Sequence, residues 1–101
     1  MAREKNRDPN MHRNHRNRLK ERFLRDGLAG FEEHNVLELI LFYAIPRRDT
    51  NELAHTLIDR FGSVAGVFDA SYQMLLSVPG VSVHTATLLK LIPALFERYR
   101  K

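Results

Sequence analysis

The feature that most constrains the fold of this chain is a Pro-Gly pair between two apolar helical segments. Pro79 has no backbone N–H to continue a preceding helix, and Gly80 can take the positive φ that reverses a chain within about two residues. Ser82 stands where a helix N-cap belongs, and the small side chain of Ala86 allows two helices to approach closely. The sequence therefore predicts a helix, a tight turn and a second helix.

This pattern is the outline of a helix-hairpin-helix motif. Such a turn aims consecutive backbone N–H groups at one point, at the positive end of a helix, which suits a phosphate. Gly80, Ser82 and Ala86 follow the G-x-G-x-x-x-A spacing, with serine in place of the second glycine. The Cβ of serine limits the approach of a ligand, and His84 stands where lysine would be the better phosphate partner. The alternative interpretation is a helix–helix turn that binds no ligand.

Basic residues are concentrated at the N-terminal end. Residues 1–25 hold nine Lys and Arg against three acids, a net charge of +6, and the rest hold seven against nine, a net charge of −2. This distribution is typical of a segment that meets phosphate, although a solvated tail and helix face would have it too. The basic residues predicted to add electrostatic attraction are Arg16, Arg18, Lys20, Arg22, Arg47 and Arg48.

A length of 101 residues suits a single folded domain. We expect a flexible basic arm over residues 1–11 and one domain over residues 12–101. The chain has no cysteine, which excludes disulfides, a thiol nucleophile and a cysteine-based zinc site. The segment MAREKNRDPN lacks the apolar stretch of a signal peptide, and the run from Leu39 to Ile45 is too short to cross a bilayer. We therefore expect a cytoplasmic protein that does not bind membranes.

Helical periodicity covers most of the chain, and no segment shows sustained strand alternation. The predicted helix over residues 36–45, the second in the chain, is apolar almost all round and is expected to form the centre of the core. The fold class is therefore all-α, a compact bundle of about six helices. The predicted segments are a basic amphipathic helix over 12–26, helices over 36–45 and about 50–61, a short connector from 63, a helix capped by Ser71, and a last helix over 82–100.

Capping residues mark several of these boundaries. Asn35 with Glu38 resembles a capping box for the second helix, and Asp49 with Glu52 caps the third. Pro93 lies inside the last helix, where it cannot donate a hydrogen bond, so a kink is expected there rather than a break.

No catalytic or metal-binding constellation is recognisable. His12 and His15 are near neighbours on a helix, but no third ligand has a spacing that completes a site. His34 is expected in a loop and His55 as a partly buried structural residue. We therefore expect no metal, no cofactor and no enzymatic activity.

Acidic and aromatic side chains also have ordinary structural explanations. Glu32, Glu33 and Glu38 are expected to be helix-start charges rather than an acid/base pair. Three aromatic residues lie among aliphatic neighbours and are expected in the core rather than in a base-stacking platform: Phe31, Phe42 and Tyr43.

Three runs of the sequence carry a family resemblance: HRNRLKERFLRDGLAGF, LELILFYAIPRRDTNELAHTLIDRFGSVAGVFDAS and LLSVPGVSVHTATLLKLIP. Together they resemble the N-terminal helix-hairpin-helix region of RadC (UPF0758) proteins. The FGS connector before a PG hairpin is also similar to the tandem helix-hairpin-helix domains of nucleotide excision repair nucleases such as UvrC and of the RuvA C-terminal region. The resemblance implies a tandem helix-hairpin-helix architecture with an added basic N-terminal helix, in a bacterial protein labelled as DNA repair.

The resemblance also implies where function resides. Family members carry a metallopeptidase-like domain after this module, but its His-x-His…Asp zinc signature occurs nowhere in this chain, so no hydrolase activity is carried over. The hairpin does carry over. It implies a phosphate-facing backbone at Gly80, Val81, Ser82 and Val83, with His84, Thr85 and Lys90 nearby.

We therefore expect a DNA-binding module without sequence specificity, because a turn that touches only backbone phosphates reads no bases. The alternative is a protein-interaction or oligomerisation module for a separate or lost metallopeptidase-like domain. Ser82 and His84 favour this alternative, since better phosphate-binding residues could stand at both positions.

Overall fold

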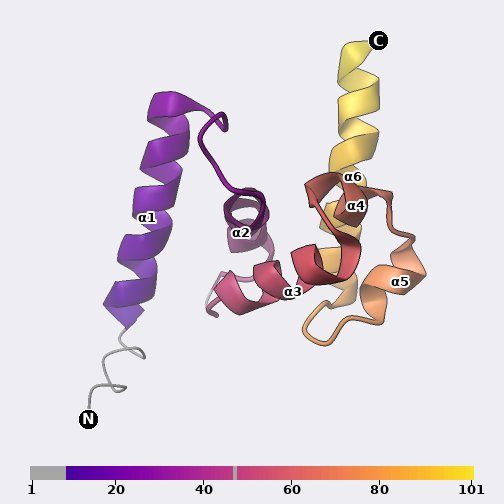
Figure 1. Cartoon of the computed structure of the whole chain (residues 1–101), viewed down its shortest axis with the longest axis horizontal. Coiled ribbons are helices and arrows are strands. Elements are labelled where there is room, and N and C mark those ends of the chain that lie inside the picture. The colour runs from indigo at the N-terminus through magenta and orange to yellow at the C-terminus, as the bar shows by residue number, and fades with distance from the viewer. Residues whose placement is uncertain (1–8, 47) are drawn as a thin grey trace.

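The computed structural model describes residues 9–46 and 48–101, and within them the chain is all-helical (Figure 1). The six helices are α1 (Pro9–Asp26), α2 (Glu33–Ala44), α3 (Asn51–Phe61), α4 (Val64–Asp69), α5 (Tyr72–Leu76) and α6 (Val83–Arg100). This confirms the predicted fold class. Residues 1–8 of the predicted arm lie outside the described residues. Helix α1 begins at Pro9 rather than at His12, so residues 9–11 belong to the helix and not to the arm.

Helix α2 occupies the centre of the fold, as predicted. It packs against α1, α3, α4 and α6, and Leu37 and Leu41 are fully buried. These two residues join Leu57 of α3, Val67 of α4 and Leu89 of α6 in one continuous core. The neighbouring Leu39 and Ile40 are only partly buried, so Leu37 and Leu41 are the residues of α2 at the centre of this core.

Helix α1 packs mainly on α2 and stands apart from α4, α5 and α6 (Figure 1). Its buried apolar contact is Leu19, whereas Leu24 is 80 % exposed. Polar contacts described below complete the attachment. In the described part of the chain no helix is both long enough and apolar enough to span a membrane.

The serine caps expected at Ser71 and Ser82 are confirmed, and Ser63, which was expected only to start a connector, is a cap as well. Each serine Oγ accepts a hydrogen bond from the backbone N–H three residues further on, which satisfies one of the unpaired donors at a helix start. The caps are Ser63 for α4, Ser71 for α5 and Ser82 for α6. Helix α6 also continues through Pro93 without a break.

The predicted caps of α2 and α3 are wrong in part. Helix α2 begins at Glu33 with Glu32 as its N-cap, so Asn35 lies inside the helix. Glu38 is only 1 % exposed and belongs to an interhelical polar network rather than to a capping box. At α3, Asp49 does accept the N–H of Asn51 at 2.9 Å, although the N-cap residue itself is Thr50.

Three further expectations are corrected. His34 lies in α2 rather than in a loop, and its ring stacks on that of His55 with centroids 4.0 Å apart. His55 is exposed rather than partly buried. Tyr43 is also exposed, since it faces away from the α2 core while its neighbour Phe42 is buried.

Candidate nucleic-acid interface

The chain reverses direction between α5 and α6 in a short hydrogen-bonded turn. The N–H of Val78 donates to the carbonyl of Leu75, and the N–H of Val81 donates to the carbonyl of Val78, both at 3.1 Å. Gly80 has a φ of +94°, a backbone conformation that residues other than glycine rarely adopt. Val78 and Val81 are buried, so their side chains anchor the turn to the core.

Four backbone N–H groups of this turn have no hydrogen-bond partner within the described residues: those of Gly80, Ser82, Val83 and His84. All four residues are exposed. The first turn of an 18-residue helix adds the positive end of its dipole to these donors. The main chain here can therefore hold an anion such as a phosphate oxygen.

Val81, of the predicted phosphate-facing backbone, and Thr85, predicted nearby, have internal partners instead. The N–H of Val81 closes the turn, as described above. Thr85 is 1 % exposed, and its N–H donates to Ser82 Oγ at 3.2 Å. The available donors are thus the backbone groups on either side of Val81.

Lys90 also has an internal role. Its ammonium group donates to the carbonyl oxygens of Phe68 and Ala70, both at 2.8 Å, at the C-terminal end of α4. A cation in this position satisfies carbonyls that the helix leaves unpaired and interacts favourably with the helix dipole. Lys90 therefore holds α4 against α6.

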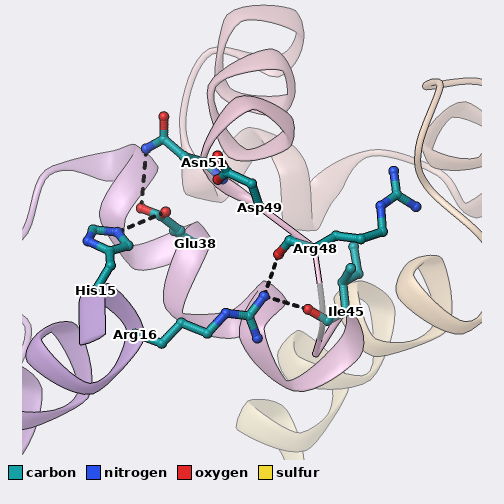
Figure 2. A network of polar contacts seen from close by, with 7 residues as sticks. All are labelled: His15, Arg16, Glu38, Ile45, Arg48, Asp49 and Asn51. Carbon is teal, nitrogen blue, oxygen red and sulfur yellow. Dashed lines mark hydrogen bonds and ion pairs between the residues drawn. The ribbon is translucent and has the colours of Figure 1, made fainter. Parts of the chain in front are cut away.

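Arg16 is likewise committed to the fold (Figure 2). Its guanidinium donates to the carbonyl oxygens of Ile45 and Arg48, both at 2.6 Å. A third bond, to the carbonyl oxygen of Phe42, is 3.2 Å long. It also lies 4.5 Å from the centroid of the Phe42 ring. Burial lowers the pKa of Arg16 from its ordinary value, while Glu38 and Asp49 oppose that shift. A side chain of α1 thus caps the C-terminal end of α2.

The other basic side chains predicted on α1 divide into two groups. Arg22 donates to the carbonyl of Gly30 at 2.8 Å and lies over the Phe31 ring. Lys20 lies over the exposed ring of Tyr43. Arg18, by contrast, is exposed. Of the two arginines predicted in the loop after α2, Arg48 is exposed and Arg47 lies outside the described residues. Arg18 and Arg48 are therefore the predicted cations best placed to meet an external phosphate.

A buried carboxylate links α1, α2 and α3 (Figure 2). Glu38 Oε2 lies 3.1 Å from Nε2 of His15, and Oε1 accepts a hydrogen bond from the side-chain amide of Asn51 at 3.4 Å. Burying a carboxylate is costly unless it is paired, so these partners stabilise the charge. The network fixes the start of α3 beside the loop that carries Arg48.

A solvent-open groove with a cavity volume of about 220 Å³ separates the start of α3 from the turn before α6. A Cβ built on Gly80 would lie 3.5 Å from Leu53 Cδ1, so the turn packs directly beside α3. A smaller hollow continues the groove toward His15 and Arg16 of α1, with Arg48 lining both. The larger groove is lined by Ile45, Arg48, Asp49, Thr50, Glu52, Leu53, Thr56, Pro79 and Gly80.

Sequence reasoning missed this groove. The turn and the third helix were each predicted, but nothing in the local patterns places Leu53 against Gly80. The available signal was a pattern that occurs twice, in which a turn that contains proline precedes a helix: Pro46 before α3 and Pro79 before α6. Whether the groove and the turn bind nucleic acid stays a prediction.

Known proteins with similar sequences are much longer than this chain. The chain is 42 % identical over 78 residues to a UPF0758 protein of Fusobacterium nucleatum, and 42 % identical over 86 residues to a UPF0758 protein of Ruegeria pomeroyi. These matches cover 77 % and 85 % of this chain but only 34 % and 38 % of the relatives. The chain thus matches little more than a third of the relatives' length. No family model and no solved structure matches it.

Proposed function

The chain belongs to the UPF0758 family, and on that premise we propose that it is a DNA-binding module without sequence specificity. It contacts backbone phosphates through the turn between α5 and α6. The observation that carries the proposal is a set of four backbone N–H groups on exposed residues, which lack partners within the described residues. Main-chain donors at a helix start suit phosphate oxygens and do not distinguish one base from another.

Charge supports the proposal in a limited way. The chain carries a formal net charge of +4, which favours approach to a polyanion. Arg16 and Lys90 bind carbonyl groups within the fold, so they stabilise the module rather than contact DNA. The electrostatic attraction in the described residues therefore comes mainly from exposed arginines such as Arg18 and Arg48.

A charge substitution at the start of α6 tests the proposal without weakening the helix. Val83 is 61 % exposed and is the first residue of α6. A carboxylate there is favourable for the helix dipole but repels a phosphate held by the same turn. Val83→Glu should lower DNA affinity at least about tenfold, which is the effect of roughly 1.4 kcal/mol, while leaving the melting temperature unchanged or raised.

The neutral variant Val83→Gln serves as the matched control, since it has similar size and should bind DNA nearly as the parent does. The measurement is fluorescence anisotropy with a labelled duplex and a labelled single strand at fixed salt. Equal affinity of Val83→Glu and Val83→Gln would contradict a phosphate contact at this turn.

A second candidate function is a protein-interaction module. The C-terminal half of α6 projects beyond the other helices (Figure 1) and exposes Leu91, Leu95, Phe96 and Tyr99 to between 54 % and 86 %. Exposed apolar groups gathered on one helix favour contact with another protein surface. Because the chain matches only about a third of its relatives, the rest of such a longer protein is the candidate partner. Leu95→Lys separates the two functions. It should weaken association, measured by sedimentation, and leave DNA binding, measured by anisotropy, unchanged.

A further inference from the structure

We infer that the groove between α3 and the turn holds the base of one unpaired nucleotide, so that the module prefers single-stranded or locally unpaired DNA to continuous duplex. The inference rests on the proposed phosphate contact at the turn. It adds the class of DNA that is bound and a second set of contacting residues.

Gly80 connects the two sites. It supplies one of the unpaired backbone N–H groups of the turn, and it also lines the groove beside Pro79. A nucleotide whose phosphate lies on this turn therefore has its sugar and base at the mouth of the groove. The groove has a cavity volume of about 220 Å³. This is below the roughly 300–1,000 Å³ of pockets for drug-sized ligands, so the groove suits one base rather than a whole nucleotide.

A buried hydroxyl beside the groove lacks a hydrogen-bond partner among the described residues. Thr50 lines the groove and is 2 % exposed, yet its Oγ1 has no hydrogen-bond partner among the described residues. The carbonyl of Thr50 is satisfied, because it accepts the N–H of Ala54 at 2.9 Å. Buried hydroxyls without a partner are rare in folded proteins. A polar group of a ligand in the groove would provide the missing partner if the side chain of Thr50 turned toward it.

The remaining lining residues suit a base better than a second phosphate. Asp49 and Glu52 bring two carboxylates to the groove, and these repel phosphate oxygens but accept hydrogen bonds from amino groups of bases. Leu53 and Pro79 supply apolar walls for the flat face of a base. Arg48, which also lines the groove, favours the neighbouring phosphate.

Base pairing decides which DNA can use the groove. In duplex, the base edge that carries the amino group is paired and stacked, so it reaches a protein groove only after unstacking. An unpaired nucleotide does not bear this cost. Two carboxylate acceptors further favour a base with an exocyclic amino group, so cytosine should be bound better than thymine, which has none.

The test compares three labelled probes of equal length with the whole chain: oligo-dC, oligo-dT and a mixed-sequence duplex. The proposal expects oligo-dC to bind at least about tenfold more tightly than duplex and several-fold more tightly than oligo-dT. Glu52→Gln should remove most of the preference for dC over dT. Thr50→Val, which keeps the side-chain shape, should weaken single-strand binding while duplex binding stays unchanged.

Glu97→Gln is the matched control, because Glu97 is an exposed glutamate near the far end of α6. Circular dichroism melting confirms that each variant is folded. Equal affinity for all three probes, combined with weakened binding in Val83→Glu, would overturn the inference and leave the phosphate contact standing. Absence of binding to every probe would overturn the proposed function as well.

Discussion

The guanidinium nitrogen Nη2 of Arg16 lies 2.6 Å from the carbonyl oxygen of Ile45, so a side chain of the first helix caps the end of the second (Figure 2). The same group also donates to the carbonyls of Phe42 and Arg48. Basic residues on α1 therefore serve two purposes. Some attach α1 to the rest of the fold, and others remain exposed.

Arg16→Gln should destabilise the fold by about 1.5–3 kcal/mol, the range for hydrogen bonds made by a charged group. The reason is that three carbonyl oxygens near the end of α2 lose a charged donor. Urea unfolding followed by circular dichroism measures the change. Arg18→Gln is the control, since this exposed residue on the same helix should alter stability by no more than about 0.5 kcal/mol. Equal effects of the two variants would contradict the role of Arg16.

Lys90→Met should destabilise the fold by about 1–3 kcal/mol and leave DNA affinity unchanged. Methionine keeps much of the aliphatic stem but leaves the carbonyls of Phe68 and Ala70 without their donor. Unfolding and anisotropy titrations are measured on the same sample. A loss of DNA affinity with unchanged stability would show that the ammonium group acts on DNA instead.

Leu41→Ala should cost about 2–5 kcal/mol, because a fully buried leucine at the centre of the core is replaced by a cavity. Leu24→Ala is the matched control on α1, where the side chain is mostly exposed. Its effect should stay within about 0.5 kcal/mol. Similar costs for both substitutions would contradict the central position of α2.

These contrasts show what the sequence could predict. The two predicted serine caps and the burial of α2 follow from local patterns, namely a short polar residue before a helix and an apolar run within one, and both are confirmed. The roles of Arg16 and Lys90 depend on carbonyls that are 29 and 22 residues away in the chain, at Ile45 and Phe68. No local pattern contains such a pairing.

Glu38 illustrates the same limit. Its spacing from Asn35 matches a capping box, but α2 begins earlier and carries the carboxylate into the junction with α1 and α3. The groove beside Gly80 also arises from tertiary packing, since Leu53 belongs to a different helix. Local patterns identified the turn, whereas packing determines what surrounds it.

Salt dependence checks the number of phosphate contacts. Each phosphate neutralised on duplex contributes about −0.9 to the slope of log affinity against log salt. Arg18→Gln combined with Arg48→Gln should therefore make the slope shallower by about 2. Arg98→Gln, which changes an exposed arginine near the end of α6, is the control and should leave the slope unchanged. An unaltered slope in the double variant would exclude these arginines as contacts.

The most direct test of the phosphate contact is a nitrogen–proton NMR titration of the whole chain with a short oligonucleotide. The account predicts that the amide signals of Gly80, Ser82, Val83 and His84 shift most. The signal of Val81 should move less, because its N–H is already bound to the carbonyl of Val78. Shifts confined to the C-terminal half of α6, with the turn unchanged, would contradict the account.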